Sequence, residues 1–188
     1  MRIIVGITGA SGSVYGIRLL GVLRTYEKVE THLVITDTGK KTIQLETTKK
    51  VEEVETLAHH VYDNQDLAAP ITSGSFRTEG MVIIPCSVKT LSGIAHSFNT
   101  NLLIRASDVM LKEKRKLIIG CRETPLHLGH LRLLTQLSEM GAIILPPIPA
   151  FYHHPQNIQN IIDHSIGKVL DQLGLEHQLF KRWKEPLV

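Results

Sequence analysis

A glycine-rich segment near the start of the sequence carries the clearest chemical signal. Gly6, Gly9 and Gly12 lie in and after an apolar run at residues 3–7, and a helical pattern of apolar residues begins at Val14. Glycines let a strand turn sharply into a helix, whose first amide groups bind anions. The spacing matches neither the dinucleotide motif nor the NTPase loop. We favour a nucleotide or phosphate ligand here; a tight turn without a ligand is the alternative.

A second group of polar residues follows the apolar run at residues 81–85. Ser87 is placed to cap the next helix, and Lys89 and Thr90 fall in the first turn of that helix. A capping hydroxyl satisfies amide groups that have no partner at a helix start. Capping alone would account for Ser87, whereas the added charge and hydroxyl would suit a bound anion. Both interpretations stay open.

The other candidates are charged residues and histidines at helical spacing. Arg105, Asp108 and Lys112 share one face of an expected helix, a pattern typical of a surface ladder of ion pairs. His127 and His130 are three residues apart, which suits a metal, but no third ligand follows at a recognisable interval. We therefore predict no metal site.

Composition and size indicate one soluble α/β domain. The chain has 188 residues, 43% hydrophobic and 21% charged, with a net charge of +3. This length suits a single well-buried domain, and the low charge argues against a nucleic-acid partner. Two cysteines and no recognisable signal peptide predict reduced thiols and a cytoplasmic location. No apolar run reaches the length of a membrane span, so no membrane association is expected.

Alternating strands and helices must position these residues. Five apolar runs have the character of buried strands, at residues 3–7, 31–36, 81–85, 116–121 and 142–145. Strands that alternate with helices predict a doubly wound parallel sheet, a Rossmann-like fold, in a single domain covering residues 1–188. A tail from about residue 174, which holds Trp183, is expected to be loosely attached.

Helical spacing predicts the segments between the strands. The expected helices include one that begins near Gly39 and is capped by Asp37 or Thr38, and others at residues 51–60, 101–113, 127–141 and 156–173. His59 and His60 are expected at the solvated end of the second of these helices.

The carboxyl ends of parallel strands lie at one edge of an open sheet, where ligands bind. The polar residues expected at this edge are Gly9–Gly12, Thr36, Ser87–Thr90, Arg122, Glu123 and Tyr152. Their amides, hydroxyls, guanidinium and carboxylate form a better indication of a binding site than any single motif.

Several motifs, in this order, resemble those of the UbiX-type flavin prenyltransferases, formerly labelled aromatic-acid decarboxylases. They are Thr8-Gly9-Ala10-Ser11-Gly12, Pro85-Cys86-Ser87, Leu111-Lys112-Glu113, Arg122-Glu123-Thr124-Pro125, Phe151-Tyr152-His153 and Arg182-Trp183. The resemblance covers nearly the whole chain. It implies a flavoprotein that transfers a dimethylallyl group from dimethylallyl monophosphate to reduced FMN without a metal. It also implies a homo-oligomer, typically a dodecamer, with FMN between subunits, and a separate UbiD-type decarboxylase that receives the prenylated FMN.

The resemblance further implies roles for individual residues. FMN would be held by Gly9, Ala10, Ser11, Thr36, Ser87, Val88, Lys89, Thr90 and Arg122. The prenyl phosphate would be held by Arg105, Lys112, Arg122, Glu123, Tyr152 and Lys168. Glu123 would act as general acid and base, and Ser11 with Glu46 would handle the proton on the flavin nitrogen. An allylic phosphate leaves as an anion, so a group of cations beside a proton donor suits its departure.

Two positions depart from the common pattern of the family. Thr36 stands where many relatives have Ser, which preserves the hydroxyl. Lys168 stands where relatives often have Arg, and Lys provides a point charge where Arg provides a bidentate fork.

Two other functions stay open at this stage. The first is a flavoprotein decarboxylase acting directly on an aromatic acid or on a phosphopantothenoyl-cysteine-like substrate, although the histidine and asparagine motif of the latter group is not recognisable here. The second is a non-enzymatic FMN carrier. A carrier would not need the acid/base residue Glu123 beside a cation such as Arg122.

Overall fold

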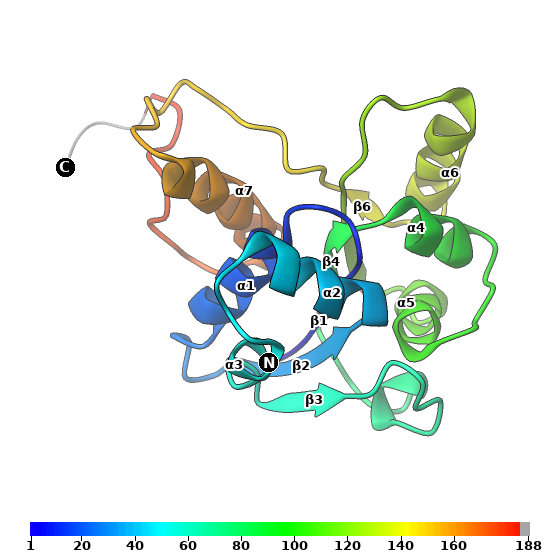
Figure 1. Ribbon diagram of the computed structural model, residues 1–188. Helices are drawn as coiled ribbons and strands as arrows, with labels where there is room; N and C mark the ends of the chain where they lie inside the picture. Colours follow the sequence, from blue (N-terminus) through cyan, green and yellow to red (C-terminus); the bar gives the residue numbers. More distant parts are fainter. Residues whose placement is uncertain (185–188) are drawn as a thin grey trace.

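The computed structural model describes residues 1–184, which form one parallel sheet with helices on both faces (Figure 1). The strands are β1 (Arg2–Ile7), β2 (Glu30–Ile35), β3 (His60–Tyr62), β4 (Gly80–Cys86), β5 (Lys116–Cys121) and β6 (Ile143–Ile144). Their order in the sheet is β3-β2-β1-β4-β5-β6, and every pairing is parallel. The strand order reverses between β1 and β4, so the doubly wound α/β fold is confirmed.

Two groups of helices cover the two faces of the sheet. The helices are α1 (Ser13–Leu23), α2 (Asp37–Glu46), α3 (Val51–Glu55), α4 (Val88–Ala95), α5 (Leu102–Lys112), α6 (Leu128–Glu139) and α7 (Ile158–Leu173), with a short 3₁₀ turn at Pro70–Thr72. Side chains of α1, α2, α3 and α7 share one buried cluster, and those of α4, α5 and α6 share the other. Within residues 1–184, no helix combines the length and the apolar character that crossing a membrane requires.

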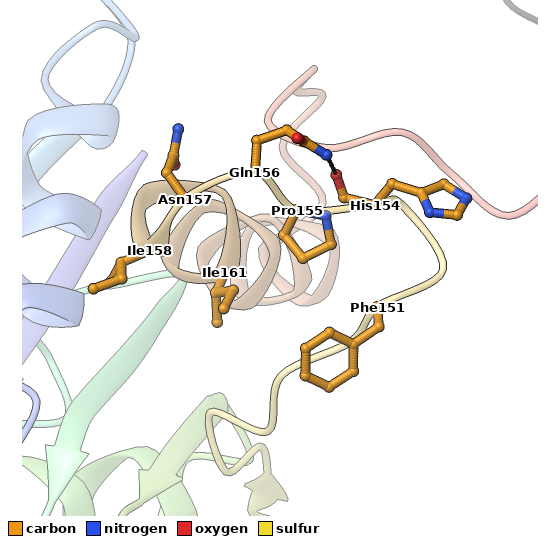
Figure 2. Close-up of a pocket in the computed structure, with 7 residues that line it drawn as sticks. All are labelled: Phe151, His154, Pro155, Gln156, Asn157, Ile158 and Ile161. Atoms are coloured by element: carbon orange, nitrogen blue, oxygen red, sulfur yellow. Dashed lines mark hydrogen bonds between the residues drawn. The ribbon is translucent and has the colours of Figure 1, made fainter.

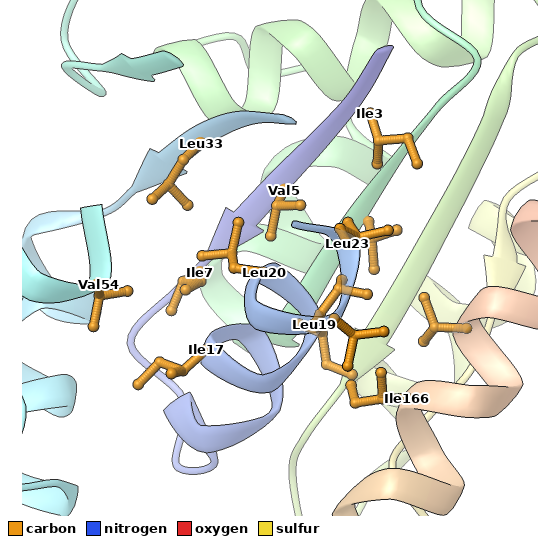
Figure 3. Packing of buried hydrophobic residues seen from close by; sticks show 14 of the residues in the cluster. Ile3, Val5, Ile7, Ile17, Leu19, Leu20, Leu23, Leu33, Val54 and Ile166 are labelled. Carbon is orange, nitrogen blue, oxygen red and sulfur yellow. The ribbon is translucent and has the colours of Figure 1, made fainter. Parts of the chain in front are cut away.

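The central strand β1 explains why the strand sequences are almost wholly apolar. Its residues Ile3, Val5 and Ile7 belong to the same buried cluster as Leu20 of α1 and Ile166 of α7 (Figure 3). The residues between them face the cluster on the other side of the sheet. A strand buried on both faces needs apolar residues at every position rather than at alternate ones.

The edge strand β3 corrects the sequence-based prediction. We expected a helix at residues 51–60, but α3 ends at Glu55 and His60 begins β3. His60 pairs in register with His32 of β2, and Nδ1 of His59 accepts a hydrogen bond from the Thr31 amide at 3.1 Å. Pairing with β2 overrides a helical pattern at this end, and a strand of three residues is too short to show a period of its own.

The described part of the tail is docked against α7, so its expected loose attachment is wrong. The Arg182 guanidinium donates to both carboxylate oxygens of Asp171, at 2.7 and 3.2 Å. The Trp183 ring meets the Tyr152 ring edge-on, with centroids 5.4 Å apart. Residues 185–188, the last part of the predicted tail, lie outside the described residues.

Candidate functional site

Buried Thr8 joins the two loops that leave β1 and β4 at the centre of the carboxyl edge. Its hydroxyl donates to the Pro85 carbonyl at 2.8 Å and accepts from the Ser87 amide at 2.8 Å. Its amide donates to the same carbonyl at 3.2 Å. These bonds fix the glycine turn relative to the start of α4. This role of Thr8 could not be predicted from the sequence, because a threonine after a strand does not reveal which loop it will contact.

The glycines of the turn allow close packing within the protein. A side chain at Gly9 would overlap the Thr38 side chain in the first turn of α2. Gly12 has a φ of 104°, a left-handed conformation that L-residues rarely adopt. Gly9 therefore brings the turn against α2, and Gly12 lets the chain enter α1.

The start of α1 is satisfied by a carboxylate of the chain itself. Glu46, the last residue of α2, accepts from the Gly12 amide at 2.9 Å and from the Ser13 amide and hydroxyl at 3.0 Å. Burial tends to raise the pKa of Glu46, but hydrogen bonds from Ser11, Gly12 and Ser13 lower it below its usual value. The anion that we expected at this helix start is therefore Glu46, which corrects the predicted position of a ligand phosphate.

A different anion position opens where α2, α4 and α5 begin. It is a pocket of about 130 Å³ lined by Thr36, Asp37, Thr38, Asn64, Gln65, Ser87, Lys89, Thr90, Asn101 and Ile104. Thr36, Ser87 and Asn101 are the caps of the three helices, and each accepts an amide hydrogen bond. The first turns of helices contain further amides without an intrahelical acceptor, and the positive ends of three helix dipoles meet here. The pocket is therefore suited to an anion such as phosphate.

The caps at this pocket partly confirm the sequence-based prediction. Ser87 caps α4 as expected, with its hydroxyl 3.3 Å from the Thr90 amide. The cap of α2 is Thr36, whose hydroxyl accepts from the Gly39 amide at 3.0 Å, so neither Asp37 nor Thr38 has that role. The helix accordingly begins at residue 37 rather than near 39.

Arg122 and Glu123 follow β5 at the same edge and are exposed. The Arg122 amide donates to the Cys86 carbonyl at 3.1 Å, which places this loop beside the one after β4. Burial raises the pKa of Tyr15 in α1, and the Arg122 charge lowers it, so the guanidinium lies near α1. The Glu123 carboxylate accepts from the Thr124 amide at 3.0 Å. Neither charged side chain forms an ion pair within residues 1–184, so both are available to a ligand.

The charged residues of α5 form only part of the expected ladder. Arg105 pairs with Asp108 at 2.9 Å. Lys112 pairs instead with its neighbour Glu113, at the end of α5 that is remote from the Asn101 cap. Within one chain, Lys112 therefore lies far along α5 from the pocket.

Tyr152 and Lys168 lie with α7, on the other face of the sheet from α5 (Figure 1). The Tyr152 hydroxyl is 3.2 Å from Nε2 of His164, and the Lys168 ammonium is 3.5 Å from Asp171. The sheet separates these residues from Arg105 on α5. The six residues predicted to hold a prenyl phosphate are therefore not gathered within one chain.

An open hollow of about 530 Å³ lies between residues 151–158 and the start of α7 (Figure 2). Phe151 is 66% exposed and Ile158 is 76% exposed at its rim. Large exposed apolar groups of this kind mark surfaces that other proteins cover.

Comparisons with known proteins find relatives over nearly the whole chain. The family model described as Flavoprotein matches residues 1–171. Flavin prenyltransferase UbiX of Escherichia coli K12 is 56% identical over 185 residues, which cover 97% of this chain and 98% of that protein. Flavin prenyltransferase UbiX of Thauera aromatica is 58% identical over 183 residues, covering 97% of this chain and 94% of that protein.

Two solved structures are similar over almost the whole chain. One is a dodecameric FMN-dependent UbiX-like decarboxylase from Escherichia coli O157:H7, with a TM-score of 0.97 and 49% identity over 98% of this chain and all of that one. The other is AnUbiX (PadA1) in complex with FMN and dimethylallyl pyrophosphate, with a TM-score of 0.96 and 45% identity over 99% of this chain and 98% of that one.

Proposed function

The chain belongs to the flavoprotein family and, within it, to the UbiX flavin prenyltransferases, and we propose that it transfers a dimethylallyl group from dimethylallyl monophosphate to reduced FMN. One observation of the structure carries the proposal. A pocket formed by three helix starts lies at the same edge as the free side chains of Arg122 and Glu123 and the bonded pair Ser11 and Glu46. Phosphate binding, positive charge and proton transfer are thus available together.

The size of the pocket indicates which part of FMN it holds. Sites for whole cofactors have volumes of about 300–1,000 Å³. At about 130 Å³, this pocket suits the phosphate end, with Thr36, Ser87, Lys89 and Thr90 around it and Val88 beginning α4 beside Ser87. The flavin ring would then lie outside the pocket, against the turn formed by Gly9, Ala10 and Ser11 and toward Arg122.

Each side chain at the edge has a distinct chemical task in this proposal. Reduced FMN supplies the nucleophilic ring atoms when bound. Arg122 stabilises the negative charge of the departing phosphate, and Glu123 donates a proton to it and later accepts one from the ring carbon. The Ser11 side chain is hydrogen-bonded to Glu46. Because the lowered pKa keeps Glu46 ionised, the Ser11 hydroxyl donates to it and its oxygen stays available to an N–H group.

We propose that the prenyl-phosphate site is completed between subunits. Arg105 and Lys112 on α5 cannot meet Tyr152 and Lys168 around α7 in one chain, because the sheet lies between them. In a homo-oligomer they can come from different copies. The exposed apolar groups around Phe151 and on α6 supply surface for such contacts. A dodecamer like that of the E. coli O157:H7 relative is the assembly that we propose.

The direct test supplies anaerobic reduced FMN with either dimethylallyl monophosphate or dimethylallyl pyrophosphate. Mass spectrometry should detect FMN carrying one dimethylallyl group, with the monophosphate as the better donor. A parallel incubation with an aromatic acid measures release of carbon dioxide. Decarboxylation without prenylation would favour a decarboxylase, and FMN binding without either reaction would favour a carrier.

Mixing inactive variants tests the shared site. Glu123→Gln and Lys112→Ala should each lower turnover when every subunit carries the change. Co-expressed subunits should recover activity, because some sites then combine an intact Glu123 with an intact Lys112 from another copy. Mixed oligomers no more active than the better parent would show that the two residues act within one chain.

We also propose that a separate UbiD-type decarboxylase uses the product. Adding the product of this protein to such an enzyme in its cofactor-free form should restore decarboxylation, whereas unmodified FMN should not.

A further inference from the structure

Three potential metal ligands meet at the amino edge of the sheet, the edge opposite the pocket. Glu30 and His32 are two residues apart in β2 and therefore share a face. His60 of β3 is paired in register with His32 and lies on the same face. One oxygen of Glu30 and one nitrogen from each histidine all lie within 4.8 Å of one another. Within residues 1–184, this is the one group of three or more such ligands.

The two distances to Glu30 are close to those of a metal centre. Oε1 of Glu30 is 2.9 Å from Nε2 of His60 and 3.4 Å from Nε2 of His32. Ligands of a tetrahedral zinc ion, each about 2.0–2.2 Å from the metal, are about 3.3–3.5 Å apart. The ligand nitrogens of His32 and His60 are farther apart, within 4.8 Å, and their rings are stacked with centroids 4.7 Å apart. Because a metal lies in the plane of each imidazole ligand, zinc binding would require the half-exposed His60 ring to turn toward Glu30.

His32 provides a second, independent observation. It is 1% exposed, and within residues 1–184 its Nε2 has no well-aligned hydrogen-bond partner; the Glu30 carboxylate lies 3.4 Å from it. Its other nitrogen, Nδ1, is 2.9 Å from the Tyr62 hydroxyl. A proton on Nδ1 donated to Tyr62 leaves a lone pair on Nε2, whose nearest ligand atom is Oε1 of Glu30, as in metal sites whose histidines are oriented by a second hydrogen bond.

The second oxygen of Glu30 is held by Arg2. The Arg2 Nε donates to Oε2 at 3.1 Å, which leaves Oε1 toward the histidines. The Arg2 charge also repels a cation. We therefore expect a weaker site than a structural zinc site made of cysteines.

We propose that Glu30, His32 and His60 bind one divalent transition-metal ion, with Zn²⁺ as the preferred ion, and that water completes its coordination. The ion would link β3, an edge strand of three residues, to β2. The site lies away from the flavin edge and is independent of the proposed prenyl transfer. Sequence spacing pointed to His127 and His130 instead, because the register that brings His60 to His32 is not visible in the sequence.

The test titrates metal-free protein with Co²⁺, whose visible absorption reports tetrahedral nitrogen and oxygen ligands, and then displaces it with Zn²⁺. Wild-type protein should bind one ion per chain, and Zn²⁺ should raise its melting temperature. His60→Ala should weaken binding by more than about 100-fold, because losing a ligand costs more than losing a supporting hydrogen bond. Tyr62→Phe should weaken binding by about 10-fold.

The matched control is the double variant His127→Ala/His130→Ala, which removes the closest alternative pair of histidines, with ring centroids 3.6 Å apart. It should bind Co²⁺ as wild type does. His60 is half-exposed, so its replacement tests the site without disturbing the core as replacing His32 would. Equal binding by wild type and His60→Ala, loss of binding in the control, or no binding by wild type would each overturn the proposal.

Discussion

The starts of α1 and α4 follow neighbouring strands at the same edge of the sheet, but their first amide groups have different partners. At α1, the amides of Gly12 and Ser13 are taken by the carboxylate of Glu46. At α4, the Ser87 hydroxyl accepts one amide, and the rest of the turn borders an open pocket. A helix start is open to a bound anion only where the chain supplies no anion of its own.

The two carboxylates of this edge differ in the same way. Glu46 accepts hydrogen bonds from three consecutive residues of the glycine turn. Glu123 is exposed and accepts from the adjacent Thr124 amide. The first carboxylate is fixed as part of the fold, whereas the second can respond to a ligand. Replacing Glu123 should therefore affect turnover, whereas replacing Glu46 should also affect stability.

The largest effect is expected from Glu123→Gln. The amide keeps the shape of the side chain but cannot exchange protons, so turnover should fall by about 10²–10⁴-fold. FMN affinity and stability should barely change, since the lost interaction belongs to the transition state. Rapid-quench assays and FMN titrations measure the two quantities, with Glu139→Gln at the exposed end of α6 as the control. Turnover at the wild-type rate would remove Glu123 from the mechanism.

A smaller effect, on stability, is expected from Glu46→Gln. The negative charge at the start of α1 should contribute about 1 kcal/mol, weakened by salt because the side chain is exposed. Urea unfolding at a fixed protein concentration measures this difference. Unchanged stability would show that the carboxylate is not needed at the helix start, and the contrast between α1 and α4 would then lose its physical basis.

The effect of Glu46→Gln on stability should also depend on pH. Folding lowers the pKa of Glu46 from its usual 4.5, so its contribution is complete above pH 4.5 and is lost as the pH falls through the lower folded value. The stability difference between wild type and Glu46→Gln should therefore be constant near neutral pH and should shrink in acid. A difference that grew in acid would contradict the lowered pKa.

The sequence predicted what depends on local pattern and missed what depends on packing. Ser87 was recognisable as a cap because it contacts Thr90, three residues away. Glu46 was not recognisable from the pattern as the partner of Gly12, because 34 residues separate them and their contact depends on how α2 packs. The family resemblance paired Ser11 with Glu46, but it did not indicate that Glu46 fills the anion position.

The strands and the site show the same difference between features set by local pattern and features set by packing. Long apolar runs predicted the four central strands and the position of β6, whereas β3 exists only through its pairing with β2. Residue types predicted the members of the site, but not that Arg105 and Tyr152 lie on opposite sides of the sheet. That separation follows from the connection of helices to strands in three dimensions.

The smallest effect is expected at the open helix start, from Lys89→Gln. Lys89 is exposed in the first turn of α4 and lines the pocket, so its charge attracts a phosphate without filling a cap position. Because exposed charge pairs are weak, FMN should bind about two- to fivefold less tightly, and the difference should narrow at high salt. Lys41→Gln, in the exposed second turn of α2, is the matched control and should leave the affinity unchanged. FMN titrations at two salt concentrations measure the affinity of both variants. An equal loss of FMN affinity in the two variants would indicate a general charge effect and would argue against a phosphate at the start of α4.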